Sequence, residues 1–313
     1  MHIALTGATG FAGKLILQEL LREKHTVKAL ARNPEALKNK NIEIVPGDLA
    51  DATALAKLVS NAQCVVHVAG AIMAQNRSGY FKANLDGTKL LYAAAKSAGA
   101  ARFIYISSIT ARESLLSDYA ASKAAAELFL VGQKHGPEVL ILRPSAIYGP
   151  GDKATLPLLK GLQSRYAILP GRASARFSLI HVQDFARVVA SSITSPVCGI
   201  LEVDDLSGGH TWAELVNIHR DLTGMPQTTL FAPKAAAHIV AGCVELFGLI
   251  ARKPTMANRG KVTELYHQDW VARGANWPRD NPIVLKQGYE DTLKWYIEHG
   301  WLQNKFQIAR RFT

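Results

Sequence analysis

A glycine-rich turn near the start of the chain constrains the fold more than any other feature. The sequence GATGFAG occupies residues 7–13, directly after the apolar run Ile3–Thr6 and at the start of a helical pattern. In such a turn the first glycine permits a tight bend, the second lets the backbone approach a pyrophosphate, and the third allows close helix–sheet packing. The helix start adds unpaired N–H groups and a positive dipole end. We therefore expect a dinucleotide site rather than a purely structural turn. Its predicted contacts are Gly7, Thr9, Gly10, Phe11 and Gly13.

Short β-rich runs alternate with longer helical patterns over residues 1–150. Each run is almost continuously apolar, as expected for parallel strands covered on both faces. The alternation predicts an α/β fold, a doubly wound parallel sheet of the Rossmann type. The predicted strands are Ile3–Thr6, Val27–Ala31, Ile42–Val45, Cys64–Ala69, Phe103–Ser107 and Val139–Leu142, and the predicted helices are Phe11–Lys24, Thr53–Asn61, Gly79–Ala98 and Asp118–Lys134.

Residues 151–313 have longer loops, recurring Pro and Gly, and mostly helical patterns after Thr211. We expect residues 1–150 to bind NAD(P) and residues 151–313 to form a smaller, mostly helical substrate-side region, partly interleaved with the sheet. A short β segment, Phe177–Ile180, precedes a helical pattern at Val182–Ile193. The stretch Ala235–Ala251 is the most apolar in the chain. We expect a buried helix there; the alternatives are a helix that lines an apolar pocket or one that touches a membrane surface.

Composition narrows the class of protein. No run of 18 apolar residues is uninterrupted, so a spanning helix is not expected. The three cysteines and ten histidines form no CxxC or HxxxH pattern, so no metal site or disulfide framework is expected. No charged region precedes the first strand, and we predict a cytoplasmic protein without a signal peptide. The net charge of +11 is scattered and fits a solvated surface, with no basic patch interleaved with aromatic residues for nucleic acid.

The end of the second predicted strand bears on the choice of dinucleotide. An acidic residue there would hold the ribose 2′-hydroxyl of NAD, whereas a basic residue would accept the 2′-phosphate of NADP. This chain has Arg32 at that point and no acid before Glu35. We expect NADP(H) to be preferred, with help from Lys38 and Lys40 and with NAD(H) as the alternative; Arg32 facing solvent alone is the other interpretation. After the third strand, Asp48 and Leu49 are placed to flank the adenine.

The pattern Tyr-x-x-x-Lys occurs twice, at Tyr92–Lys96 and Tyr119–Lys123. On a helix these two positions share a face, so the ammonium, together with an oxidised nicotinamide, lowers the phenol pKa from about 10. Only the second pair follows the carboxyl end of a strand, where α/β sheets place their sites. We therefore assign Tyr119 to acid/base chemistry and Tyr92 to packing or solvent.

Hydroxyl and amide side chains accompany this tyrosine. Ser108 is placed to hydrogen-bond a substrate oxygen, or else to cap the local backbone, and Thr110 is a third hydroxyl. Asn84 is predicted to hold backbone and water near Lys123, with an ordinary helix asparagine as the alternative. The predicted catalytic set is thus Ser108, Tyr119, Lys123 and Asn84.

These motifs in this order resemble the extended short-chain dehydrogenase/reductase family, the NAD(P)-dependent epimerase/dehydratase group. The resemblance covers nearly the whole chain. The segments that carry it are TGATGFAG (6–13), GDL (47–49), HVAG (67–70), NLDGT (84–88), ISS (106–108), YAASK (119–123), LRPSAIYGPGD (142–152), HVQD (181–184) and GYEDTLKWYIEHGWL (288–302).

The resemblance implies a Rossmann fold with a helical C-terminal domain over the substrate. It also implies that Lys123 binds the nicotinamide ribose, that Ala69 and Gly70 lie along the cofactor, and that the stretch from Pro144 to Ile147 borders the nicotinamide. It further implies a dimer through the helices Gly79–Ala98 and Asp118–Lys134, although a monomer stays open.

Departures from the family pattern narrow the reaction. Sugar-nucleotide dehydratases of the group carry Thr-Asp-Glu where this chain has Ser108-Ile109-Thr110, which disfavours dehydration. The epimerase continuation Val-Tyr-Gly is replaced by Ala111-Arg112-Glu113. The interval of eleven residues from Ser108 to Tyr119 is short for epimerases. It is closer to a compact branch that includes proteins similar to the NADPH-binding accessory subunit of respiratory complex I.

Three functions follow in order of preference. The first is an NADP-dependent oxidoreductase acting on a ketone or secondary alcohol of a hydrophobic small molecule. The second is a sugar-nucleotide epimerase that retains NAD. The third is an NADPH-binding accessory or assembly protein with little turnover, for which an intact Ser-Tyr-Lys set would not be needed.

Overall fold

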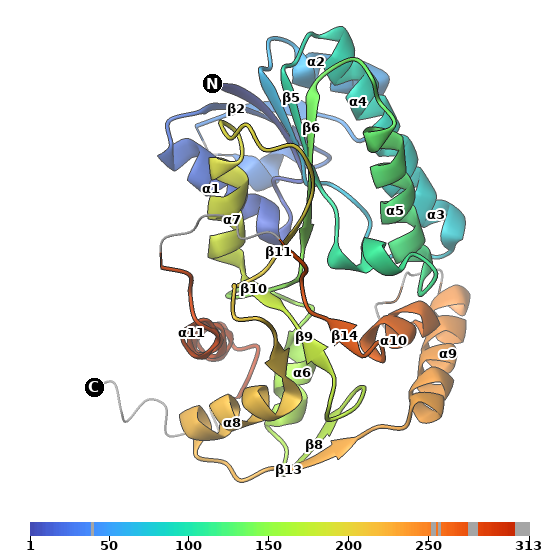
Figure 1. Cartoon of the computed structure of the whole chain (residues 1–313), viewed down its shortest axis with the longest axis vertical. Coiled ribbons are helices and arrows are strands. Elements are labelled where there is room, and N and C mark those ends of the chain that lie inside the picture. Colours follow the sequence, from blue (N-terminus) through green and yellow to red (C-terminus); the bar gives the residue numbers. More distant parts are fainter. Residues whose placement is uncertain (39–40, 252–254, 256–257, 275–280, 304–313) are drawn as a thin grey trace.

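A seven-stranded, all-parallel sheet forms the centre of the molecule (Figure 1). The computed structural model describes residues 1–38, 41–251, 255, 258–274 and 281–303. The strand order is β11-β6-β5-β4-β1-β2-β3. The strands are β1 His2–Thr6, β2 Thr26–Ala31, β3 Glu43–Pro46, β4 Cys64–His67, β5 Arg102–Ile106, β6 Glu138–Pro144 and β11 Gly199–Val203. The predicted Rossmann-type fold is confirmed, and each predicted strand lies within a few residues of its observed place.

Helices cover both faces of this sheet, which explains why its strands are apolar at most positions. Ile3 and Leu5 pack against α1 (Phe11–Arg22) and α7 (Val182–Ser191) on one face. Ala4, between them, packs on the other face with side chains of α2 (Ala52–Val59), α4 (Gly87–Ser97) and α5 (Asp118–Val131), because successive side chains of a strand point to opposite faces. Figure 1 shows α1 and α7 on one side of the strands and α4 and α5 on the other.

The last strand and one covering helix come from far along the chain. β11 pairs with β6 in parallel register, with Leu201 opposite Leu142. α7 packs against α1, since Phe185 and Val189 share the core that contains Ile16. One strand from beyond residue 150 therefore completes the sheet. The order of strands reverses at β1, which has β4 on one side and β2 on the other. Doubly wound sheets open a ligand crevice beyond the carboxyl ends of the strands at such a point.

A separate apolar core lies under the sheet edge, built from Tyr148, Leu162, Trp212, Tyr289 and Leu293. It holds together short strands and helices from the second half of the chain. The elements outside the central sheet and its covering helices are η1 Pro34–Leu37, α3 Arg77–Phe81, η2 Lys82–Asp86, η3 Ile109–Glu113, β7 Ala146–Tyr148, α6 Leu156–Leu162, β8 Tyr166–Leu169, β9 Arg176–Phe177, β10 Leu179–His181, β12 His210–Thr211, α8 Trp212–Thr223, β13 Thr228–Phe231, α9 Lys234–Ile250, α10 Arg259–Leu265, β14 Asp269–Trp270 and α11 Leu285–Glu298.

Three sequence predictions need adjustment. The helix expected at Gly79–Ala98 is three pieces, because the π-helical turn η2 separates α3 from α4. The β segment expected at Phe177–Ile180 is divided between β9 and β10. The burial expected for the apolar helix, α9, is wrong, since it leaves several large apolar side chains exposed. None of the helices in the described part of the chain is both long and apolar enough to cross a bilayer.

The packing of α11 against the strands β7 and β10 depends on the absence of a side chain at Gly288. A Cβ there would lie 2.4 Å from the hydroxyl oxygen of Tyr148 and 2.9 Å from Cδ2 of His181, and both rings are buried. We predict that Gly288→Ala lowers the free energy of unfolding by about 1–3 kcal/mol through overpacking. Denaturant unfolding measures this. Gly161→Ala, where a Cβ meets nothing within 4 Å, is the control, and an equal loss in both variants would contradict the packing argument.

Candidate functional site

The turn after β1 has the geometry that the glycine pattern predicts. Gly7 has a φ of +79°, and the N–H of Gly10 donates to its carbonyl oxygen at 2.9 Å. A Cβ at Gly13 would lie 1.9 Å from that same oxygen, so only glycine lets α1 begin this close to the turn. Gly10 caps α1 without a side-chain hydrogen bond, and the first turn holds no acidic residue. Together with the exposed Thr9, this cradle fits the pyrophosphate of a dinucleotide, which would satisfy the free N–H groups.

The segment after β4 lies against this turn. The N–H of Ala69 donates to Oγ1 of Thr6 at 3.2 Å, and a Cβ on Gly7 would come within 2.7 Å of the Ala69 nitrogen. A Cβ on Gly70 would lie 2.8 Å from Oδ1 of Asn84 and 3.3 Å from Nζ of Lys123. Ala69 and Gly70 therefore join the phosphate cradle to the predicted catalytic residues.

A buried histidine orders this junction, and sequence reasoning missed it. His67 is fully buried, with Nδ1 2.8 Å from Oγ1 of Thr6 and Nε2 3.0 Å from Oγ1 of Thr88. Thr88 donates its hydroxyl proton to the carbonyl of Asn84 at 2.6 Å, so it accepts from Nε2–H, and Nδ1 accepts from Thr6. Burial, aided by the charge of Lys123, lowers the pKa of His67 to about 3, which keeps the ring neutral. The one available signal was a histidine at the end of a wholly apolar strand.

The predicted adenine end is open to solvent. Arg32 follows β2, is exposed, and forms no hydrogen bond or ion pair with any residue that the structure describes. Lys38 pairs with Glu35 at 3.1 Å, and Lys40 lies outside the described residues. Oδ1 of Asp48 accepts from the N–H of Ala50 at 2.8 Å.

Leu49 and two residues from later in the chain occupy the remaining predicted positions around the crevice. Leu49 packs against the start of α4, where a Cβ on Gly87 would lie 2.9 Å from the Cβ of Leu49. Pro144 ends β6 opposite Val203, and Ile147 is the middle residue of β7.

Tyr119 and Lys123 lie one turn apart on α5, beside the carboxyl end of β5. Nζ of Lys123 donates to the carbonyl oxygen of Ile106 at 2.8 Å and lies 4.7 Å from the ring centre of Tyr105. Ser117 caps α5, since its Oγ accepts from the N–H of Ala120 at 2.9 Å. This cap fixes the first turn of the helix, on which Tyr119 stands.

Ser108, Thr110 and Asn84 are close to this pair. Ser108 Oγ accepts from the hydroxyl and the N–H of Thr110, at 2.9 and 3.2 Å, so the predicted backbone cap is present. Hydrogen bonding between Ser108 and Tyr119 also contributes to the pKa of the phenol. Asn84 accepts from the N–H of Ala71 at 2.7 Å and donates to Oγ of Ser122 at 2.9 Å. The structure thus brings together all four residues predicted as catalytic.

Burial controls the protonation of both groups on α5. It raises the pKa of Tyr119 far above its usual range; the bond with Ser108 opposes the rise, and Glu264 and Tyr80 add to it. The sequence predicted a lowered pKa for this phenol, and in the protein alone the loss of solvation outweighs any nearby cation. Burial also lowers the pKa of Lys123 to about 8, against the raising effect of Glu127.

Glu127 continues the same face of α5 one turn beyond Lys123, and sequence reasoning missed it as well. Its carboxylate accepts a short hydrogen bond from Oγ of Ser107 and two contacts from Nε of Arg143, at 2.9 and 3.2 Å. Side chains of Tyr119, Lys123 and Glu127 therefore form one stripe along α5.

A second carboxylate extends this network toward the C-terminal segments. Glu202 on β11 lies 3.6 Å from Nη1 of Arg143 and 2.8 Å from Nη1 of Arg112. Arg112 also donates to the carbonyl of Asp269 at 3.0 Å, and Glu202 accepts from the N–H of Arg273 at 2.7 Å. This network of ion pairs and hydrogen bonds connects β11, at the edge of the sheet, to β14.

α10 contributes the far wall of the site. Glu264, buried on α10, accepts a hydrogen bond from Oγ of Ser117, the residue that caps α5, and lies 2.8 Å from Nζ of Lys261. The rings of Tyr80 and Tyr119 meet edge to face with centroids 6.2 Å apart. The start of α5 is therefore held by a residue from a distant part of the chain.

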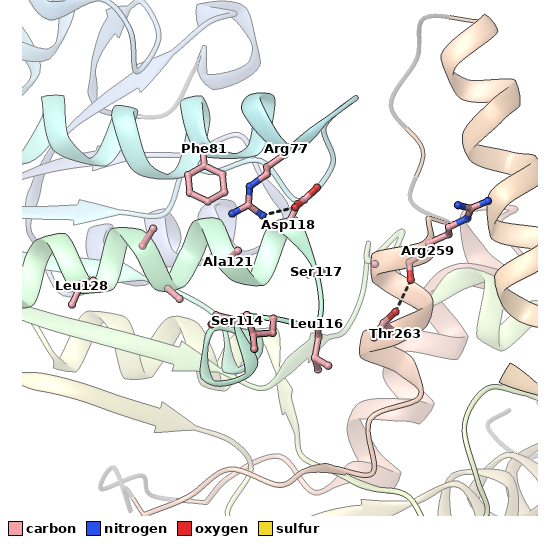
Figure 2. A pocket seen from close by; sticks show the side chains of 14 residues that line it. Arg77, Phe81, Ser114, Leu116, Ser117, Asp118, Ala121, Leu128, Arg259 and Thr263 are labelled. Carbon is pink, nitrogen blue, oxygen red and sulfur yellow. Dashed lines mark hydrogen bonds and ion pairs between the residues drawn. The ribbon is translucent and has the colours of Figure 1, made fainter. Parts of the chain in front are cut away.

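A cleft of about 720 Å³ lies on the outer flank of α5, between α3 and α10. Figure 2 shows Arg77 beside Phe81, bonded to Asp118, on one side and Arg259 on the other. Neither Ser108 nor Tyr119 lines it. This cleft therefore lies beside the predicted catalytic residues and is not the pocket in which they would act.

The other Tyr-x-x-x-Lys pair has a different setting. Tyr92 is buried, and its ring meets those of Phe103 and Phe129 edge to face, at 5.4 and 5.9 Å. The assignment of Tyr92 to packing is confirmed.

Comparisons with known proteins agree with this geometry. Residues 3–200 match the model of the NAD dependent epimerase/dehydratase family. A ceramide reductase of Caulobacter vibrioides is 35% identical, over 96% of each chain. A UDP-glucose 4-epimerase of Vibrio cholerae is 28% identical, over 95% of each chain. Among solved structures, the UDP-glucose 4-epimerase of Thermotoga maritima with UDP-glucose superposes with a TM-score of 0.74 at 16% identity, over 96% of this chain and 99% of that one, which shows a shared fold.

The lowered pKa of Lys123 predicts a specific dependence of stability on pH. Between about pH 8 and 10.5 the unfolded chain binds this proton and the folded chain does not, so the contribution of Lys123 to stability rises with pH across that window. As the pH rises from about 8 to about 10.5, the free energy of unfolding of the native protein should gain about 3 kcal/mol that Lys123→Met does not gain. Unfolding in denaturant at several pH values measures this. The exposed Lys96→Met is the control, and a pH-independent difference for Lys123→Met would contradict the buried-amine interpretation.

Proposed function

The chain belongs to the NAD-dependent epimerase/dehydratase family, and from that premise we propose that it is an NADPH-dependent reductase that converts a ketone on a ceramide-type lipid into a secondary alcohol. An NAD(P)-binding enzyme of the short-chain dehydrogenase/reductase type is what the relatives establish. The finer proposal rests chiefly on one observation, the 35% identity to a ceramide reductase over 96% of both chains. The absence of an acid pair after Ser108, which disfavours dehydration, supports it.

Each residue of the predicted set has a role in this reduction. When bound in the crevice, the nicotinamide supplies a hydride to the carbonyl carbon. The hydroxyl of Tyr119 would give its proton to the carbonyl oxygen: the Tyr119 O–H bond, the C=O π bond and the C–H bond of the hydride donor break, while the C–H and O–H bonds of the alcohol form. The tyrosinate that remains would take up a proton from water before the next turnover. Ser108, with Thr110 behind it, holds that oxygen beside Tyr119. Positioning of the two reactants supplies much of the acceleration.

Tyr119 is protonated and Lys123 is mostly cationic at neutral pH, as the proposed reduction requires. A proton donor must carry its proton at neutral pH, and burial raises the pKa of Tyr119 well above its usual range. Lys123, with a pKa of about 8, is mostly cationic at neutral pH, and in this proposal it donates to the nicotinamide ribose. Asn84 fixes the backbone at Ala71 beside this lysine.

The preference for NADPH is part of the same proposal. Arg32 follows β2 with its guanidinium exposed and unengaged by the residues that the structure describes, which leaves it free for a 2′-phosphate. The nearest acid, Glu35, is paired with Lys38 at 3.1 Å and is three residues beyond the place where NAD enzymes hold the ribose.

Calorimetric titration with NADPH and NADH tests the cofactor. We expect NADPH to bind at least tenfold more tightly, and Arg32→Ala to remove that preference while leaving NADH affinity unchanged, because only the 2′-phosphate contact is lost. Tenfold corresponds to about 1.4 kcal/mol. Lys14→Ala, another exposed cation on the first βαβ unit, is the control. Equal affinities, or a preference for NADH, would overturn the Arg32 assignment and favour the sugar-nucleotide epimerase as the alternative.

The reaction is tested by measuring the rate of NADPH oxidation when the keto form of a ceramide-type lipid is added in detergent. Tyr119→Phe should lower kcat by about 100-fold or more, since a positioned general acid contributes 10²–10⁴, and should keep NADPH affinity within about threefold. Tyr92→Phe is the matched control, because it removes a hydroxyl from the other Tyr-x-x-x-Lys pair. Undiminished turnover in Tyr119→Phe would remove this tyrosine from the mechanism. If the native protein does not turn over this lipid, the proposed substrate is wrong.

A further inference from the structure

The helix α9 turns its apolar side outward. Ile239 and Val240 are 69% and 62% exposed, and one to two turns later Leu246 and Phe247 are 61% and 72% exposed. Cys243, between the two pairs, is exposed too. Because these residues recur at the spacing of helical turns, they form one continuous stripe without a charge, which we call the outer stripe of α9. A surface helix normally directs such a stripe at the core.

The opposite side of α9 packs against α10, and these contacts fix the orientation of α9 about its own axis. The outer stripe therefore faces away from the protein. Ala241 is 2% exposed, and a Cβ on Gly242 would lie 2.8 Å from Nη2 of Arg259. Glu245 accepts from the N–H of Arg259 at 2.8 Å and pairs with its guanidinium at 3.6 Å. Figure 2 shows Arg259 pointing from α10 toward the neighbouring helix. The burial of Ala241 and the contacts of Gly242 and Glu245 with Arg259 thus fix which side of α9 is outside.

The segment that contains the outer stripe has a basic sequence, although Arg259 is paired with Glu245 at 3.6 Å and Lys261 with Glu264 at 2.8 Å. From residue 234 to 261 the sequence holds five basic residues and a single acid, Glu245, which gives this segment a formal charge of +4. The five basic residues are Lys234, Arg252, Lys253, Arg259 and Lys261. An apolar helical stripe beside cations is the pattern of a helix that lies in the interface of an anionic bilayer.

We propose that α9 docks the protein on the surface of an anionic lipid bilayer, with the outer stripe inserted at the level of the headgroups and the exposed Lys234, at the start of the helix, against lipid phosphates. α9 has 17 residues and is too short to cross a bilayer, so it lies along the surface. This docking goes beyond the proposed reaction and does not depend on it.

A second copy of the chain fits the outer stripe less well. Two apolar stripes would pack together, but each brings a segment of charge +4 from a protein of net charge +11, so like charges would meet at the rim. An anionic surface instead complements that charge.

Docking by α9 would place the bilayer close to the catalytic residues. α9 holds α10, and Glu264 of α10 binds Ser117 at the start of the helix that carries Tyr119. A lipid substrate would therefore travel past two helices, and not through bulk water, to reach the site.

Sedimentation of vesicles with the full-length protein tests the docking. We expect strong binding to vesicles of equal parts phosphatidylcholine and phosphatidylglycerol, weaker binding to phosphatidylcholine alone, and loss of the difference at high salt. The double variant L246Q/F247Q should bind the anionic vesicles at least tenfold more weakly. The double variant I168Q/V284Q removes two apolar side chains that are each 65% exposed elsewhere, and should bind as the native protein does.

Further measurements decide the remaining outcomes. Native protein that fails to bind anionic vesicles, or L246Q/F247Q binding that equals the native level, would overturn the docking. Concentration-dependent dimers in analytical ultracentrifugation that L246Q/F247Q abolishes, without vesicle binding, would assign the stripe to a second copy. NADPH affinity and thermal unfolding should be the same in both double variants, which shows that folding is intact. Vesicle binding without any ketone turnover would sustain the docking while the proposed reaction failed.

Discussion

The attachment of α5 to the carboxyl end of β5 is the constraint on which the candidate site depends. Three side chains one turn apart, Tyr119, Lys123 and Glu127, face the strand, and two of them are anchored by direct bonds: Lys123 to the carbonyl of Ile106 and Glu127 to Ser107. Because the helix is fixed at two successive turns, the phenol at its start has a defined position. Burying an ammonium and a carboxylate in one stripe is costly for each alone, and each offsets part of the desolvation of the other.

Buried charge also connects the sheet to the segments that follow it. Arg143 stands between the carboxylates of Glu127 and Glu202, and Glu202 in turn holds Arg112 and the backbone near β14. Removing one member of such a chain leaves an uncompensated charge in a poorly solvated place, which typically costs about 3–5 kcal/mol. The same chain thus supports α5, which carries the proposed proton donor, and the backbone near β14, so a loss of stability at these positions would be accompanied by a loss of the proposed activity.

Much of the sheet and the core of the site could be predicted because their signals are local. The glycines at residues 7–13 stand between a strand and a helix, and Tyr119–Lys123 follows a strand end. His67, Glu127 and Glu264 were missed because each is a single polar residue whose partners lie elsewhere in the chain; Glu264 meets Ser117 across 147 positions. For α9, the sequence showed only a strongly apolar stretch and suggested burial, since only the contacts of Arg259 with that helix decide which side is covered.

The long separation between Glu264 and Ser117 has a consequence for the order in which the protein matures. The nucleotide crevice is built from β1, β4 and their neighbours, and the sheet around it is complete once β11 has joined at residues 199–203. The start of α5, in contrast, gains its hydrogen bond with the buried carboxylate of Glu264 only when α10 has folded against it. Contacts of high sequence separation form late, because closing long loops is slow. During synthesis, a chain with a complete nucleotide crevice would therefore precede one in which Glu264 holds the start of α5, where the proposed proton donor lies.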